Sequence, residues 1–155
     1  MPCDATTGVG GSPCRLSPTL LLLLHFFGVA MAVGGGIALS QVGPKLIAMP
    51  TSERGQLWPL EVFFSRLGSF GLLVLLITGP LMVWLKFGGV GGFNSWFWAQ
   101  MALVVVAAIG VGLHDWAGAR FRRGDEGATS LMFIGGRVAG ASMLLVMLCA
   151  VFAFN

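Results

Sequence analysis

Charged side chains are scarce in this sequence of 155 residues, since Asp, Glu, Lys and Arg together make up only 10% of it. A water-soluble domain usually carries about 25% charged residues. Tyrosine is absent, whereas 56% of the residues are hydrophobic and the mean hydropathy is +0.88. A chain this apolar would not keep its surface in water. The composition therefore excludes a soluble globular protein and favours burial in a lipid bilayer.

Motifs that carry common soluble chemistry are missing as well. The sequence has no CxxC pair, nucleophile elbow, phosphate-binding loop, zincin motif or carboxylate dyad, so zinc-ribbon, thioredoxin-like, hydrolase and kinase functions have no support. Cys3 and Cys14 precede the first apolar run, and Cys149 lies in the last one. Cys3 and Cys14 form either a disulfide, if they face an oxidising compartment, or two free thiols. The net charge of +3 comes from short connections between apolar runs and does not indicate nucleic acid.

Four long apolar runs follow a polar N-terminal tail at 1–18. We expect a single transmembrane domain at 19–155, with spans at about 20–39, 59–85, 95–116 and 130–154. A helix needs about 20 apolar residues to cross a bilayer. Runs of this length predict helices rather than strands. The predicted fold is therefore all-α, an integral membrane four-helix bundle with a short irregular tail.

Lys and Arg are unevenly distributed among the connections. The first and third connections contain Lys45, Arg54, Arg120, Arg122 and Arg123, whereas the tail and the middle connection contain only Arg15 and Lys86. The positive-inside rule therefore predicts a multi-pass protein of a bacterial-type plasma membrane with both termini in the periplasm. Tryptophans support these boundaries, with Trp84, Trp96 and Trp98 in an outer belt and Trp58 and Trp116 in an inner one.

Small residues recur every four positions in two of the spans. The first span has Gly28, Ala32 and Gly36, and the fourth has Gly136 and Gly140. Such stripes let helix backbones approach closely in lipid. They indicate either packing within one bundle or contact with another subunit or a second copy.

His25 is the most informative polar residue, because a histidine deep in an apolar helix is costly and normally faces the bundle interior. It is a candidate ligand of haem iron or of chlorophyll magnesium, or a proton carrier; the alternative is a structural hydrogen bond to a neighbouring helix. Gln100 lies at a similar depth, so we expect the two side chains to share a site. His114 lies roughly 20 Å away by helical rise and is not expected to bind the same haem. We expect His114 and Asp115 to form a solvated pair at the inner interface.

Arg66 and Arg137 lie one or two turns inside the basic ends of their spans. They either reach out to lipid phosphates or bind carboxylates such as haem propionates, since arginine pairs with a carboxylate in a bidentate fork. The candidate cofactor site thus comprises His25 as the metal ligand with Gln100, Arg66 and Arg137. No catalytic residue is predicted.

Several short motifs occur in a characteristic order: Leu24-His25 followed by glycines, Arg66-Leu67, Thr78-Gly79, Trp96 and Trp98, His114 with Gly118 and Arg120, and Arg137. This order resembles the HemJ-type membrane protoporphyrinogen oxidase family and its CopD-like relatives. The resemblance implies a b-type haem, a functional histidine in the first span and a functional lysine early in the third. His25 matches the histidine, but Gln100 stands at the lysine position. An amide forms hydrogen bonds but carries no positive charge.

Two functions of different class fit the sequence. The first is a haem-associated membrane oxidoreductase that oxidises a porphyrinogen or passes electrons. The second is a non-catalytic accessory subunit of a larger respiratory or photosynthetic complex. Such a subunit would use its glycine stripes and apolar faces to contact other subunits, lipid or a pigment such as bacteriochlorophyll.

Overall fold

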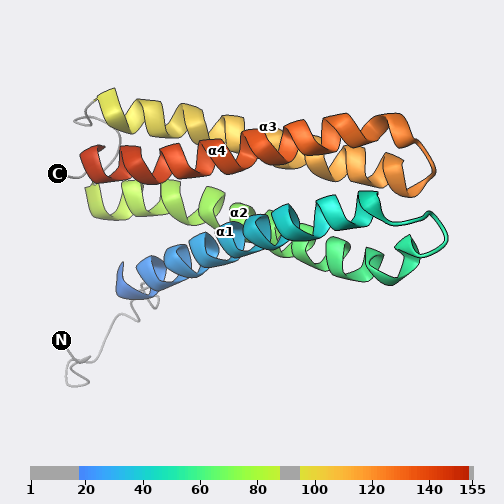
Figure 1. Cartoon of the computed structure of the whole chain (residues 1–155). Helices are drawn as coiled ribbons and strands as arrows, with labels where there is room; N and C mark the ends of the chain where they lie inside the picture. Colours follow the sequence, from blue (N-terminus) through green and yellow to red (C-terminus); the bar gives the residue numbers. More distant parts are fainter. Residues whose placement is uncertain (1–17, 88–94, 154–155) are drawn as a thin grey trace, which may run out of the picture.

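The computed structural model describes residues 18–87 and 95–153. They form four long helices, α1 (Pro18–Ala48), α2 (Trp58–Phe87), α3 (Ser95–Arg122) and α4 (Thr129–Ala153), and two short 3-10 helices, η1 (Arg54–Gln56) and η2 (Glu126–Ala128). No strand occurs in these ranges, and the predicted all-α fold with four long helices is confirmed (Figure 1). Cys3 and Cys14 lie outside the described residues.

Two of the helices are longer than predicted. α1 continues past position 39 to Ala48 and passes through Pro44, and α3 continues past position 116 to Arg122. At the polar edge of a bilayer, water can satisfy the carbonyl that a proline leaves unpaired, so the helix need not end there. α2 likewise runs through Pro80 to Phe87, so Gly79-Pro80 is not its end.

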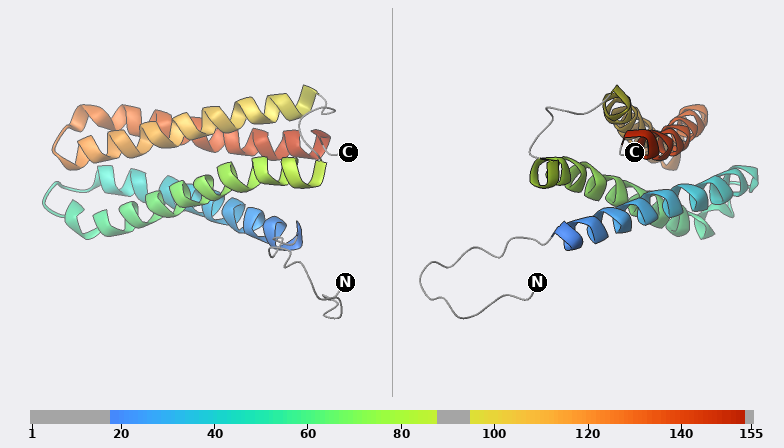
Figure 2. Two further views of the ribbon diagram at one scale, coloured as in Figure 1. Left: turned by 180° about the vertical axis from the view of Figure 1, so that it is seen from behind. Right: turned by 90° about the vertical axis from the view of Figure 1, so that its left-hand side faces the viewer.

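The helices form two antiparallel hairpins, α1 with α2 and α3 with α4 (Figures 1 and 2). The two helices of each hairpin pack along much of their length, whereas the hairpins meet more sparsely, through α1 with α4 and α2 with α3. α1 begins and α4 ends at the same end of the bundle, here called the terminal end. The α1–α2 and α3–α4 connections lie at the opposite end, here called the loop end.

Glycines let the helices of each hairpin touch through their backbones. A Cβ atom on Gly71 would lie 2.5 Å from the backbone nitrogen of Ala32, and one on Gly28 would lie 3.1 Å from the carbonyl oxygen of Gly71. In the second hairpin, a Cβ atom on Gly110 would lie 2.8 Å from the backbone nitrogen of Ala139. A side chain does not fit at such separations. The glycines therefore allow the short distance between the two helices of each hairpin.

The contacting faces of α1 and α4 agree with the predicted stripes only in part. Gly36 has nothing within 4 Å of its Cβ position, and its neighbour Gly35 makes the contact with α2 instead. On α4, Gly135 rather than Gly136 meets the backbone of α3, and open space surrounds Gly140. Adjacent residues on a helix point in directions about 100° apart. The four-residue spacing alone therefore does not show which of two adjacent glycines contacts the neighbouring helix.

A buried apolar cluster joins the hairpins at the loop end. Its members are Leu46 of α1, Ala117 and Phe121 of α3, Ala128 of η2 and Met132 of α4, with Ile47, Leu57 and Trp58 packed against it. The Trp58 ring meets the Phe121 ring edge-on, with centroids 5.5 Å apart. This cluster is the main apolar junction between the hairpins in the described part of the chain.

Most other large apolar side chains lie exposed on the bundle surface, among them Trp84 at 75% and Ile109 at 65% of their full area. Four stretches are long and apolar enough to cross a membrane: Thr19–Ala48, Trp58–Leu85, Ser95–Arg122 and Glu126–Phe152. In a bilayer, lipid tails cover these exposed apolar side chains and take the place that a protein core has in a soluble protein. The chain is therefore a multi-pass integral membrane protein.

Candidate functional site

His25 lies in the terminal half of α1, about 10 Å along the helix from its start. Its imidazole is half-buried and meets α2, where Nδ1 lies 2.8 Å from Oγ1 of Thr78. Thr78 is 1% exposed, so this contact is shielded inside the first hairpin. The tight spacing set by Gly28 and Gly71, further along the same interface, lets the imidazole reach the second helix.

The hydrogen bonds around Thr78 determine which nitrogen of His25 carries the proton. Oγ1 of Thr78 lies 2.7 Å from the carbonyl oxygen of Val74, one turn earlier on α2. A carbonyl only accepts, so the single hydroxyl proton of Thr78 is donated to Val74. Thr78 is left as the acceptor, and Nδ1 of His25 must donate to it. A neutral imidazole has one N–H, so Nε2 of His25 keeps a free lone pair.

Gly79 lies beside the same ring. A Cβ atom at this position would be 3.9 Å from Cε1 of His25, in van der Waals contact with the ring carbon that separates its two nitrogens. Gly79 therefore borders the ring at Cε1. Thr78 fixes one nitrogen of the imidazole, and Gly79 lies next to the same ring.

Gln100 does not share the hydrogen bond of His25. It lies on α3, and α1 contacts α2 and α4 rather than packing along α3. The partner of His25 is Thr78 of α2, which differs from the predicted His25–Gln100 pairing. The amide oxygen of Gln100 is buried and accepts no hydrogen bond within the described residues. A similar predicted depth does not show which helices are neighbours.

Arg66 and Arg137 are exposed and lie in the half of the bundle nearer the loop end. On α2, Arg66 precedes Thr78 by a helical rise of about 18 Å. The structure therefore does not gather the four predicted cofactor residues into one site. A contact of Arg66 or Arg137 with a haem propionate stays a prediction.

A second polar group crosses the interface between α2 and α3 near the loop end. Asp115 of α3 accepts a hydrogen bond from the hydroxyl of Ser65 at Oδ1 and from the hydroxyl of Ser69 at Oδ2, the latter at 2.6 Å. Asp115 was expected to be a solvated interfacial residue, but it is half-buried and joins the two hairpins. The spacing of Glu61, Ser65 and Ser69, one helical turn apart in an otherwise apolar run, is the sequence signal that identifies this face.

Glu61 and His114 extend this polar group towards α4. Glu61 is 1% exposed, and its Oε2 lies 3.0 Å from Nη1 of Arg122. His114 donates from Nδ1 to the carbonyl oxygen of Met132 at 2.9 Å, and its Nε2 is buried without a partner in the described ranges. His114 is thus held between α3 and α4 and is not the solvated residue that its position suggested.

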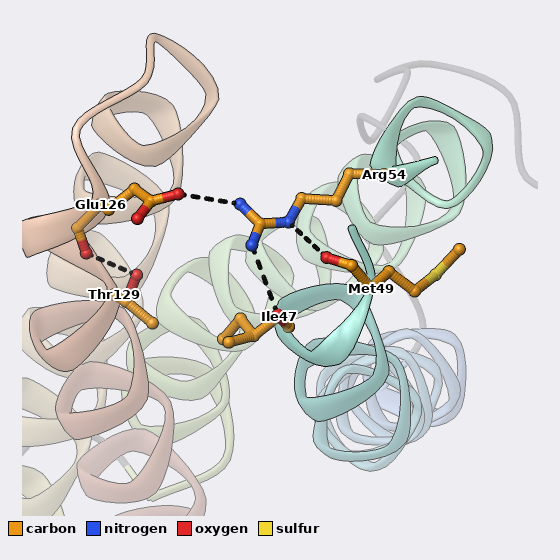
Figure 3. Close-up of polar contacts among 5 residues, drawn as sticks. All are labelled: Ile47, Met49, Arg54, Glu126 and Thr129. Carbon is orange, nitrogen blue, oxygen red and sulfur yellow. Dashed lines mark hydrogen bonds and ion pairs between the residues drawn. The ribbon is translucent and has the colours of Figure 1, made fainter. Parts of the chain in front are cut away.

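Arg54 contacts both hairpins at the loop end, as Figure 3 shows. Its guanidinium donates to the carbonyl oxygens of Met49 and Ile47 at 3.0 and 3.4 Å and lies 3.4 Å from Oε1 of Glu126. It also lies 5.3 Å from the centre of the Phe121 ring. Arg54 therefore caps the end of α1 and reaches across to the second hairpin.

Comparison of the chain with models of known protein families gave no match, and comparisons with curated protein sequences and with solved structures gave none either. Within residues 18–87 and 95–153, no three His, Cys, Asp or Glu side chains gather into a metal-binding group.

Proposed function

We propose that this membrane protein binds a b-type haem with Nε2 of His25 as an axial ligand, and that it serves membrane electron transfer or porphyrinogen oxidation. The observation that carries the proposal is the chain of hydrogen bonds from His25 to Thr78 and from Thr78 to Val74, because it assigns the N–H of a neutral His25 to Nδ1 and the lone pair to Nε2. Histidines that bind metals almost always donate their other ring N–H to a fixed oxygen, which sets the tautomer and the orientation of the ring. His25 has this arrangement, with Oγ1 of Thr78 as the fixed oxygen.

The residues around His25 fit the requirements of an axial haem ligand. Thr78 holds the ring, and its buried hydroxyl is itself held by Val74, so the lone pair of Nε2 keeps a fixed direction. Gly79 borders the ring at Cε1. The apolar side chains exposed around this half of α1 suit a macrocycle that is largely apolar. When bound, the haem supplies a one-electron redox centre in the membrane.

The proposal is tested by the absorption spectrum of protein expressed with a haem supply and purified in detergent. We expect a Soret band from wild-type protein and its loss from the His25→Ala variant. His114→Ala is the matched control, because it removes the other histidine and should retain the band. Thr78→Val should bind haem more weakly than wild type, since Nδ1 of His25 would lose its acceptor.

Two results would overturn the proposal. One is wild-type protein that stays colourless both after expression and after reconstitution with haem. The other is a Soret band that survives His25→Ala. A colourless protein that co-purifies with a larger membrane complex would support an accessory subunit instead.

A further inference from the structure

A polar groove lies between α2 and α3 in the half of the bundle nearer the loop end. Its volume is about 200 Å³, and it is lined by Val62, Ser65, Arg66, Ser69, Asp115 and Arg122. Pockets for drug-sized ligands have volumes of about 300–1,000 Å³, so this groove suits a small polar group. It lies where the hairpins pack sparsely against each other, and it is separate from the His25 site.

The carboxylate of Asp115 in the groove forms no ion pair with a described residue. Asp115 accepts one hydrogen bond at each carboxylate oxygen, from Ser65 and Ser69. No Lys, Arg or His side chain of the described residues lies within 4 Å of this carboxylate. Each carboxylate oxygen has two lone-pair directions, so both retain room for another donor. A carboxylate at membrane depth normally has a cationic partner, and an ammonium group is the ligand that would supply one.

Two guanidinium groups line the same groove. Arg66 is exposed and forms no ion pair within 4 Å with a described residue. Arg122 uses Nη1 for Glu61, which leaves most of its five N–H donors available. A phosphate is the natural partner of two such groups, because guanidinium and phosphate form parallel charge-assisted hydrogen bonds. The groove thus offers one carboxylate to a cation and two guanidinium groups to an anion.

The groove begins just inside the boundary between the hydrocarbon core and the lipid headgroups at the loop end. α2 has 30 residues and is about 45 Å long, so about 7 Å at each end extends beyond a hydrocarbon core of about 30 Å. Arg66 lies about 12 Å along α2 from the loop end, just below the hydrocarbon boundary. An arginine side chain at that level extends toward the headgroups. The ligand that is always present there is a phospholipid.

We propose that this groove binds the headgroup of phosphatidylethanolamine from the leaflet next to the basic connections. The ammonium group donates hydrogen bonds to Asp115, and the phosphate accepts them from Arg66 and Arg122. Phosphatidylglycerol has the phosphate but no ammonium. Phosphatidylcholine has a quaternary ammonium that lacks N–H donors. Of these three headgroups, only ethanolamine supplies both an N–H donor for Asp115 and a phosphate for the two arginines.

The first test compares these three lipids on wild-type protein, all with the same acyl chains. Delipidated protein is titrated with each lipid, and binding of the first molecule is measured by native mass spectrometry. We expect phosphatidylethanolamine to bind roughly tenfold more tightly than either of the others, as one additional charge-assisted contact predicts. Equal binding of the ethanolamine and choline lipids would overturn the proposal without recourse to any variant.

The second test assigns the two ends of the groove. Asp115→Asn should abolish the preference for phosphatidylethanolamine over phosphatidylglycerol, whereas Arg66→Gln should weaken the binding of both lipids. Glu53→Gln and Arg123→Gln make the same charge changes at exposed positions near the loop end, outside the groove, and should bind lipids like wild type. A monodisperse elution profile verifies that each variant is folded. An unchanged preference in folded Asp115→Asn protein would contradict the proposal. His25→Ala should leave lipid selectivity intact, so this test is independent of haem binding.

Discussion

Nδ1 of His25 and Oγ1 of Thr78 lie 2.8 Å apart across the interface between α1 and α2, and the hydroxyl proton of Thr78 is already committed to Val74. One backbone carbonyl therefore sets the protonation of a side chain on a different helix. The arrangement depends on α2 staying helical at this turn, because the acceptor is the carbonyl four residues before Thr78. Backbone geometry, rather than a charged neighbour, prepares the lone pair of His25.

The tautomer of His25 can be measured directly. In protein labelled with ¹⁵N-histidine and kept free of haem, NMR should show His25 protonated at Nδ1 and unprotonated at Nε2. Thr78→Val removes the acceptor and should shift His25 towards a mixture of tautomers. Thr129→Val removes a hydroxyl at the start of α4 and should leave the spectrum of His25 unchanged. Protonation of His25 at Nε2 in the wild type would contradict the proton assignment.

Close helix packing predicts a sharp contrast among glycines. Gly71→Ala and Gly110→Ala place a methyl group within 2.8 Å or less of neighbouring backbone atoms, and overpacking of this kind costs about 1–3 kcal/mol. Gly34→Ala and Gly140→Ala are controls, because nothing lies within 4 Å of their Cβ positions. Unfolding in mixed detergent micelles measures the difference. If the variants at Gly71 and Gly110 were as stable as the controls, the hairpins would not be in backbone contact.

Glu61 and Glu126, two of the acidic partners of arginine at the loop end, should contribute unequally to stability. Glu61 is 1% exposed, and its removal in Glu61→Ala leaves the guanidinium of Arg122 without its carboxylate, which should lower stability by about 1–3 kcal/mol. The side chain of Glu126 is 72% exposed, so Glu126→Ala should cost less than about 1 kcal/mol. The same unfolding assay compares them, and a larger loss for Glu126→Ala would reverse the ranking.

The distribution of Lys and Arg predicts which end of the bundle faces the cytoplasm. Ser52→Cys and Ser130→Cys, both exposed near the loop end, should not react with a membrane-impermeant thiol reagent in intact spheroplasts. They should react after permeabilisation. Cys3 and Cys14, after reduction, should react in intact spheroplasts. The reverse labelling pattern would show that the protein is inserted with its basic connections outside.

Length and hydropathy predicted the four helices, because a bilayer requires about 20 apolar residues per span whatever their order. They did not predict which helices are neighbours. The partner of His25 is an example, because Gln100 and Thr78 both lie at a suitable depth and only the pairing of α1 with α2 selects Thr78. The predicted stripe on α1 was wrong at Gly36 for a related reason, because Gly35 and Gly36 differ only in rotation about the axis of α1.

The polar group around Asp115 was partly accessible from sequence. Ser65 and Ser69 lie one turn apart on α2, and such a pair in an apolar helix indicates a face turned towards protein. Their partner could not be identified in the same way. The helical extension of α3 to Arg122 brings Asp115 deeper into the bundle than a helix ending near position 116 would. Along α3, less than two turns of helix separate a position at the membrane interface from a buried position.

The glycine contacts join helices that are adjacent in sequence, and this has a consequence for the order of assembly during synthesis. The connection between the two helices of each hairpin is short, so the helices pair with little loss of chain entropy. The loop-end cluster forms later, because Leu46 must wait for Phe121 and Met132 to be translated and inserted. The first hairpin can therefore pack while the second is still being made. The pairing of His25 with Thr78 needs only the first hairpin, so it does not depend on α3 or α4.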